Sequence, residues 1–268
     1  VVSKPGKRLK TVRKHIEVDD SAGIPLSLTN WGVFMRLCVN AAQYEASRES
    51  LLALMKNKKF AIGKDKNETE SIVYDLDKFL WRNEENNEKA EFLLTEFYEK
   101  TAAFRKILSN KTALLKDILR EHILFAESLA CDKNLTGVEN LWVDDDGQSG
   151  ADFMASWIAK ADILGEIDTK EYLHLFETMM SYVTVRRTRK THHRVRILGP
   201  MEARLNHYDE IILGSFNEGI WPSSPKADPW MSRPMKKDFG FESPEKQIGV
   251  LGLDFANLLG AKNVYITK

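Results

Sequence analysis

The sequence predicts an α/β fold interrupted by an all-helical insertion, because three stretches of the chain differ in the spacing of their apolar residues. Residues 1–50 combine a short alternating segment with one helix. Residues 51–190 carry apolar residues almost only at helical spacing, and residues 191–268 return to short apolar runs separated by turns. The predicted domains are therefore 1–50, 51–190 and 191–268, with the outer two forming one parallel layer from which the middle one protrudes.

The first predicted domain contains one strand and one helix. Ile16–Val18 alternates apolar and charged residues as a short strand does, and Asp19–Gly23 supplies residues typical of a turn. Thr29 or Asn30 can cap the helix that follows, because a side-chain oxygen there can accept a hydrogen bond from an unpaired backbone N–H. The helix is predicted from apolar residues at helical spacing, namely Phe34, Leu37, Cys38 and Ala41.

The predicted insertion, 51–190, is a series of helices, each with an apolar stripe along one side. Loops are predicted at Gly63–Asn67 and Asp144–Gly150, where glycine and short polar residues gather. The stripes, in chain order, are Ile72, Val73, Leu76, Phe79 and Leu80; Phe97, Phe104, Ile107, Leu108, Leu114, Leu115, Ile118 and Leu119, for one or two long helices; Phe153, Met154, Trp157 and Ile158; and Leu175, Phe176, Met179 and Met180.

The last predicted domain, 191–268, contains three buried strands. These are the short apolar runs Val195–Leu198, Ile211–Leu213 and Val264–Thr267. Ile248–Leu259 lies between the last two runs and is long enough for a crossover helix, which parallel strands require. A parallel α/β layer is therefore the predicted topology. Because the chain begins without methionine and ends on an apparent strand, we expect it to be a piece of a longer protein.

Composition indicates a folded protein and limits its partners. Hydrophobic residues make up 43% and charged residues 29% of the chain, a balance typical of globular proteins. The 39 Lys and Arg residues equal the 39 Asp and Glu residues, so any contact with nucleic acid must be local. Cys38 and Cys131 are too far apart for a CxxC unit and are assigned no role. No apolar run approaches the roughly 20 residues that cross a bilayer, so a cytoplasmic protein without a membrane partner is predicted.

The sequence lacks the common signatures of phosphate and metal sites. It contains no GxxxxGK[ST] loop. His192 and His193 are adjacent, and neighbours on a strand face opposite ways, so a solvated or phosphate-facing pair is favoured over a metal site. Asp144–Asp146 lacks the ligand spacing of a calcium loop, so it is predicted to be a solvated turn that only connects helices. We therefore predict no catalytic residue, no metal site and no cofactor held by this chain alone.

One dense basic segment, 186–196, offers a local contact for nucleic acid. It holds six Arg or Lys residues in eleven positions. Such a segment is either a polar linker leading into a strand or a surface that contacts phosphates. The candidate DNA-binding residues are Arg186, Arg187, Arg189, Lys190, Arg194 and Arg196.

The most informative stretch is Glu210–Pro222, in which a buried strand leads into a glycine-containing turn. Open α/β sheets bind their ligands at this end of their strands. Aromatic residues near the turn, Phe216, Trp221 and Trp230, could stack on bases or pack into a core, and packing is favoured. Arg233 could bind phosphate or cap a helix end.

This stretch resembles the fifth motif of UvrD-type superfamily 1 helicases, where a hydrophobic strand leads into a glycine-containing turn that ends in Glu-Gly-x-x-Pro. The matching residues are Gly214, Asn217, Glu218, Gly219, Trp221 and Pro222. A longer resemblance is to the AddB family of alphaproteobacterial type. It covers about 70 residues through Ile197–Leu205, Asp228–Pro234 and Ser243–Gly249, and, in the same order, the earlier segments Val18–Leu26 and Leu51–Lys56.

The AddB resemblance implies that residues 1–50 and 191–268 are two parts of one RecA-like domain, the second motor domain, interrupted by a helical subdomain. It further implies a parent subunit that joins an AddA-like partner in a helicase–nuclease complex, which resects broken DNA ends for recombination. ATP and Mg²⁺ are implied for that complex, with Glu218, Gly219, Arg233 and Lys246 near the nucleotide. The family's nuclease and first RecA-like domain would lie outside this chain.

Two departures from active motors predict a scaffold that holds or scans DNA. Pro200–Arg204 stands where motors carry a Lys-Gly-Leu-Glu-like sequence, and Lys246 and Lys268 stand where the sixth motif uses arginine. A lysine does not reproduce the fork of a guanidinium group. The alternatives are part of an active ATP-dependent motor and a purely structural protein-interaction domain, in which the helical insertion is the docking surface.

Overall fold

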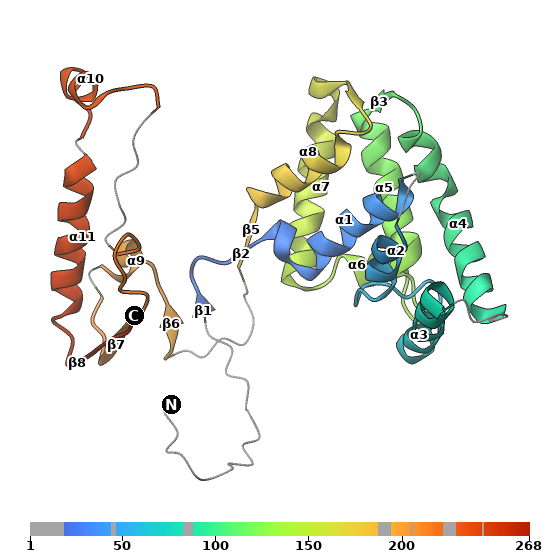
Figure 1. Cartoon of the computed structure of the whole chain (residues 1–268), viewed down its shortest axis with the longest axis horizontal. Helices are drawn as coiled ribbons and strands as arrows, with labels where there is room; N and C mark the ends of the chain where they lie inside the picture. The colour runs from blue at the N-terminus through green and yellow to red at the C-terminus, as the bar shows by residue number, and fades with distance from the viewer. Residues whose placement is uncertain are drawn as a thin grey trace, which may run out of the picture. The chain divides into compact units, whose positions relative to one another are not determined.

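The computed structural model describes residues 19–43, 47–82, 88–186, 194–204, 206–221, 229–242 and 244–268. The chain divides into two compact units (Figure 1). We call Gly23–Arg189 the helical unit, and Val1–Ala22 together with Lys190–Lys268 the α/β unit. The described residues are mostly helical, with small two-stranded sheets. None of the described helices is both long and apolar enough to span a bilayer.

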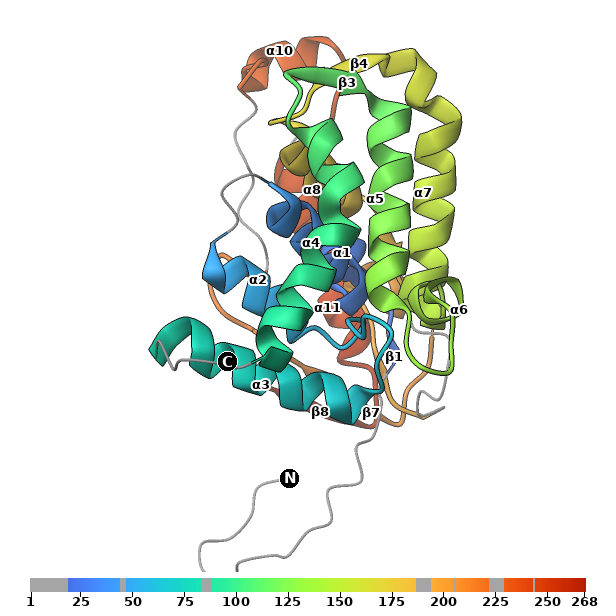
Figure 2. The same ribbon diagram turned by 90° about the vertical axis from the view of Figure 1, so that its right-hand side faces the viewer.

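The helical unit packs its helices around α5, which contacts α1, α4, α6 and α7. Figure 2 shows α4, α5 and α7 side by side. The helices are η1 (Leu26–Leu28), α1 (Asn30–Ala42), α2 (Arg48–Met55), α3 (Lys66–Arg82), α4 (Glu88–Leu108), α5 (Leu115–Ala130), α6 (Gly137–Leu141), α7 (Asp144–Leu164) and α8 (Tyr172–Ser181). Within the described residues of this unit, two antiparallel strand pairs lie between the helices: β2 (Ile24–Pro25) with β5 (Thr184–Val185), and β3 (Thr112–Leu114) with β4 (Glu166–Asp168).

The predicted apolar stripes form the core of the helical unit. The α1 helix begins after Thr29, whose side chain accepts a hydrogen bond from the Gly32 N–H at 3.1 Å, as predicted for one of the two candidate caps. Most of the stripe residues whose side chains the structure describes are buried, and the side chains of Phe79 and Leu80 lie outside that description. The eight-residue stripe belongs to two helices, α4 and α5, and Leu114 between them lies in β3 and is half exposed. The predicted break at Gly63–Asn67 separates α2 from α3, although α3 already begins at Lys66.

The loop predicted at Asp144–Gly150 is wrong, because these residues form the first turns of α7. The three aspartates stand where carboxylates favour a helix, against the positive end of its dipole. Asp146 does more than connect helices, since its Oδ2 accepts a hydrogen bond from the Trp31 N–H at 3.0 Å in the first turn of α1. Glycine is needed at 150 for close packing, because a Cβ there would lie 2.4 Å from the Trp31 ring.

The described part of the α/β unit contains two parallel strand pairs. The first pairs β1 (Asp19–Asp20) with β6 (Arg196–Ile197), and the second pairs β7 (Glu210–Leu213) with β8 (Asn263–Ile266). Its helices are α9 (Pro200–Ala203), α10 (Arg233–Asp238) and α11 (Pro244–Leu258). The predicted crossover helix is confirmed as α11, which lies between β7 and β8 in the chain. The predicted strand Ile16–Val18 lies outside the described residues.

Two expectations for the α/β unit differ from the structure. Among the described residues the parallel strands form two separate sheets, so the structure does not show one extended layer. The strands are also not buried on both faces: Ile212 is 72% exposed and Tyr265 is 53% exposed, whereas Leu213 is buried. An apolar run cannot reveal whether both faces of a strand are covered, because the covering elements come from elsewhere in the chain.

The first domain boundary lies between Ala22 and Gly23 instead of near residue 50. Residues 23–50 belong to the helical unit because α1 buries Trp31, Phe34 and Cys38 against its other helices. The second boundary lies between Arg189 and Lys190, next to the predicted one. The helical unit is thus inserted between two segments that meet in the β1–β6 pair.

Candidate functional site

The candidate site is the turn that follows β7, at the carboxyl end of the parallel β7–β8 pair. Backbone hydrogen bonds hold the turn against β8. The Phe216 N–H donates to the Thr267 carbonyl at 3.0 Å, and the Thr267 N–H donates to the Leu213 carbonyl at 2.9 Å. Within the turn, the Asn217 carbonyl accepts from the N–H groups of Ile220 and Trp221, both at 3.1 Å. The chain therefore leaves the sheet in a defined conformation.

Two residues of this turn have left-handed backbone angles. Gly219 has φ +80°, which glycine adopts without steric cost. Ser215 has φ +56°, a region in which a side chain is strained. Such strain concentrates at ligand sites, so Ser215 marks this turn as a functional candidate.

We expect Ser215→Gly to stabilise the turn and Gly219→Ala to destabilise it, by about 1 kcal/mol each, because only glycine avoids the Cβ clash at positive φ. Hydrogen exchange of the Phe216 and Trp221 amides measures the local opening free energy of each variant. Gly249→Ala on α11 is the control, since the added Cβ meets no atom within 4 Å apart from the adjacent residues and the helix's own backbone. Equal protection in the two turn variants would contradict the assignment of strain to Ser215.

The aromatic residues of the turn pack instead of presenting open faces. Phe216 stacks on Phe255 of α11, with ring centroids 5.1 Å apart and planes inclined by 27°. Trp221 meets both rings edge-on, 5.5 Å from Phe216 and 5.8 Å from Phe255. This is the packing that the sequence favoured for Phe216 and Trp221. Trp230 differs from them, since it is 88% exposed.

The four residues expected near a nucleotide lie on three different elements. Glu218 and Gly219 are exposed in the turn after β7, and Arg233 is the first residue of α10, where the Ser232 side chain supplies the cap. Lys246 lies in the first turn of α11 and pairs with Glu242. These residues do not by themselves fit ATP and Mg²⁺, because the lysine is paired with a carboxylate and Arg233 lies on a different element from Glu218 and Gly219.

An ion pair that the sequence did not reveal joins α9 to α11. Arg204 and Asp254 form a two-pronged contact, with Nε to Oδ1 at 2.6 Å and Nη2 to Oδ2 at 2.8 Å. Hydrogen bonding to Arg204, reinforced by its charge, lowers the pKa of the Asp254 carboxyl. The pair borders a cavity of about 350 Å³ at the amino end of β7, which Tyr208 and Ile211 also line. No local pattern links residues 50 positions apart, so sequence reasoning missed the pair.

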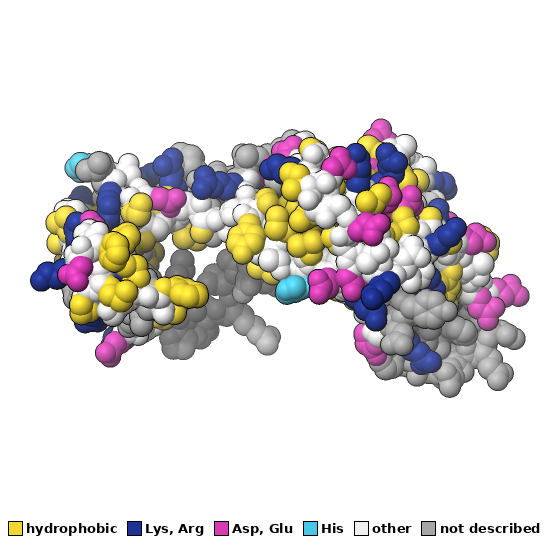
Figure 3. All heavy atoms as spheres, turned by 90° about the horizontal axis from the view of Figure 1, so that it is seen from above, with side chains coloured by type: hydrophobic (Ala, Val, Ile, Leu, Met, Phe, Trp, Pro, Cys, Tyr) yellow, Lys and Arg dark blue, Asp and Glu magenta, His cyan; other side chains and the backbone are white. Residues whose placement is uncertain are grey.

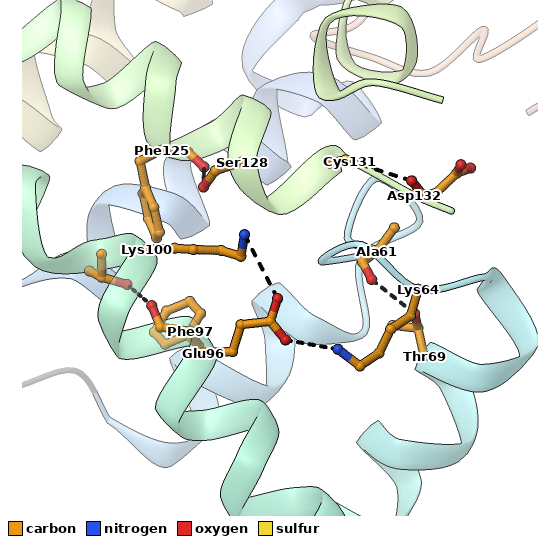
Figure 4. A network of polar contacts seen from close by, with 11 residues as sticks. Ala61, Lys64, Thr69, Glu96, Phe97, Lys100, Phe125, Ser128, Cys131 and Asp132 are labelled. Carbon is orange, nitrogen blue, oxygen red and sulfur yellow. Dashed lines mark hydrogen bonds and ion pairs between the residues drawn. The ribbon is translucent and has the colours of Figure 1, made fainter. Parts of the chain in front are cut away.

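The helical unit contains a polar network whose role is to hold its parts together (Figure 4). Glu96 of α4 accepts from Lys64 at 2.8 Å and lies 3.7 Å from Lys100. The Thr69 hydroxyl donates to the Ala61 carbonyl at 3.1 Å. The Lys64–Glu96 contact ties the loop before α3 to α4, and the Thr69–Ala61 bond ties the same loop to α3. Within the described residues, no group of three or more His, Cys, Asp or Glu side chains could hold a metal ion.

The basic segment is described at its two ends. Arg186 is exposed after β5, and Arg194 and Arg196 are exposed at the start of the last segment. Arg187, Arg189 and Lys190 lie outside the described residues, as do His192 and His193. Figure 3 shows Lys and Arg side chains intermingled with Asp and Glu on the face of the helical unit that it presents. That face therefore offers no large single-sign field.

A scan against protein-family models and a search of curated proteins found no match to this chain.

Proposed function

We propose that this chain is a DNA-binding, scaffolding module of an AddB-like subunit in a cytoplasmic helicase–nuclease complex that resects broken DNA ends. The observation that carries the proposal is the parallel β1–β6 pair, with Asp19 opposite Arg196 and Asp20 opposite Ile197. It joins the two outer segments of the chain around an inserted helical unit. This is the arrangement expected if both segments belong to one RecA-like domain, and the β7–α11–β8 crossover is the connection that such a domain repeats.

The proposal assigns DNA contact to the basic segment and nucleotide chemistry to the rest of the complex. Arg186 and Arg196, near the two ends of the segment, are exposed, so phosphates can approach their charges. A scaffold is favoured over a motor because Lys246, at the arginine position of active motors, pairs with Glu242.

Charge reversal in the basic segment tests the DNA contact. We expect Arg187→Glu with Arg189→Glu to weaken binding of fluorescein-labelled oligothymidine and of a forked duplex by about tenfold or more. Fewer phosphate contacts mean that fewer counterions are released on binding. The slope of log affinity against log salt should therefore become less steep by about 1 to 2. Fluorescence anisotropy at several salt concentrations measures both.

The control carries the same charge change elsewhere, at the exposed Lys111 and Lys160 of the helical unit. It should bind DNA nearly as the unaltered chain does. An equal loss of DNA affinity in both double variants would show that the effect comes from the change in net charge and not from the basic segment. Binding that is unaffected by reversal at Arg187 and Arg189 would favour the purely structural alternative. Retention of the chain by an immobilised AddA-like subunit tests the partner separately.

A further inference from the structure

The cavity of about 350 Å³ in the α/β unit lies at the amino end of β7, the opposite end of that strand from the turn described above. The residues that line it come from α9, the start of β7, the end of α11 and the turn after α11. Figure 1 shows α9 beside α11, which it contacts. The volume is at the lower end of the range for small-molecule sites, about 300 to 1,000 Å³.

Tyr208 brings a buried hydroxyl group to the wall of this cavity. Its oxygen has no hydrogen-bond partner among the described residues. An unpaired buried hydroxyl destabilises a fold, and nearly all buried polar groups in folded proteins have a partner. Because Tyr208 lines the cavity, a molecule bound there can supply the missing partner.

The charges around the cavity favour an anion. Among the described residues that line it, Asp254 alone carries a carboxylate, and both of its oxygens accept hydrogen bonds from Arg204. Lys262 also lines the cavity, is exposed and forms no ion pair with a described residue. The carboxyl end of α11 contributes a partial negative charge of about one half. The full charge of Lys262 exceeds it, which leaves the cavity with an excess of less than one positive charge.

Arg204 adds a fixed donor to the same wall. Its Nε and Nη2 atoms bind Asp254, whose side chain is only 3% exposed, and this two-pronged contact holds the guanidinium group in one orientation. The Nη1 atom is left without a partner among the described residues, and the arginine side chain is 38% exposed. Three kinds of donor thus line one cavity: a phenol, a guanidinium and an ammonium group.

We propose that this cavity binds a small organic carboxylate. The carboxylate accepts hydrogen bonds from Tyr208, Arg204 and Lys262, and the apolar part of the ligand packs on Ile211 and Leu258. A carboxylate is favoured over a phosphate ester, because its single negative charge is closer to the small positive excess than a charge near two is. The inference goes beyond the proposed function and does not depend on DNA binding.

Titration of the full chain with benzoate, followed by ¹H–¹⁵N correlation spectra, tests the inference. We expect the backbone amide signals of Tyr208 and Lys262 to shift, with a dissociation constant in the millimolar range that suits so small a ligand. Benzamide keeps the ring but has no charge, so it should bind about tenfold more weakly, since hydrogen bonds to charged groups are the stronger ones. Equal binding of benzamide would overturn the charge argument, and tighter binding of phenyl phosphate would overturn the choice of a carboxylate.

Tyr208→Phe removes only the hydroxyl and should weaken benzoate binding by about tenfold, the loss expected for a hydrogen bond to a charged group. The free variant should melt at the same temperature as the unaltered chain or higher, because an unpaired buried hydroxyl has gone. Tyr265→Phe is the matched control, since Tyr265 of β8 is 53% exposed and does not line the cavity.

Lys262→Gln should weaken benzoate binding by about tenfold and leave benzamide binding unchanged, because only benzoate carries a charge for the lysine to attract. Equal benzoate affinity in Tyr208→Phe and Tyr265→Phe would mean that water satisfies the hydroxyl, and the proposal would be overturned. It would be overturned equally if benzoate shifted neither the Tyr208 nor the Lys262 signal.

Discussion

Replacing Phe176 by alanine is expected to lower the free energy of unfolding of the helical unit by about 3–5 kcal/mol, the range for removing a large buried aromatic side chain. Phe176 of α8 is fully buried, and its ring lies 5.0 to 5.9 Å from those of His122, Phe153, Trp157 and Tyr172. It therefore joins α8 to α5 and α7. Little of the cavity can collapse because rings surround it on several sides.

Urea unfolding followed by far-UV circular dichroism measures this loss, since most of the helix lies in the helical unit. Met179→Ala on the same helix is the matched control, because that side chain is 37% exposed. It should cost much less than Phe176→Ala. Similar losses for the two variants would show that the aromatic cluster does not dominate the stability of the helical unit.

The same cluster shows what the spacing of apolar residues can predict. Phe176 and Trp157 were placed in the core because a helix with one apolar side must bury it. His122 could have been added, since it continues the stripe of Leu115, Ile118 and Leu119 at helical spacing. The prediction of a loop at Asp144–Gly150 is wrong because aspartate and glycine, which are common in turns, here form the start of a helix. Asp146 and Gly150 also contact Trp31, which is far away in the sequence and which no local pattern could reveal.

The site was less predictable than the core because its features depend on long-range contacts. The strand before Gly214 and the crossover helix followed from local patterns, and both are present. The strained angle at Ser215 and the Arg204–Asp254 pair have no local signature. Trp221 and Trp230 both stand near prolines in the sequence, yet one packs on Phe255 and the other is exposed. The contact of Trp221 with Phe255 of α11 joins residues 34 positions apart, so no local pattern predicts it.

His122 is the buried group through which the helical unit should respond to acid. Its Nε2 lies 3.0 Å from the Met35 carbonyl oxygen, and its Nδ1 lies 2.8 Å from the Tyr172 hydroxyl. Because a carbonyl only accepts, Nε2 carries the proton and Nδ1 accepts from the tyrosine. The Phe104 ring stacks on the imidazole at 5.1 Å. Both nitrogens of the neutral ring are thus hydrogen-bonded. A second proton would have to occupy Nδ1, where it would break the hydrogen bond that the Tyr172 hydroxyl donates.

Acidification from neutral pH is therefore expected to destabilise the helical unit. Burial lowers the pKa of His122 from its ordinary 6.5 to about 4, with the bond to Met35 opposing this in part. Between these two values the unfolded chain binds a proton that the folded chain does not, so stability rises with pH. The free energy of unfolding is unaffected by the protonation of His122 above about pH 6.5. Below that pH it falls, by about 3 kcal/mol in all as the pH approaches 4.

Urea unfolding at a series of pH values measures this dependence, with His122→Gln as the matched variant. Glutamine offers an N–H donor and an oxygen acceptor to Met35 and Tyr172 but does not titrate. The variant should be less stable at neutral pH, because it loses the ring contacts, and its stability should fall less steeply between about pH 6.5 and 4. Parallel pH profiles for the two proteins would mean that some other group takes up the proton, since only the histidine ring has been removed.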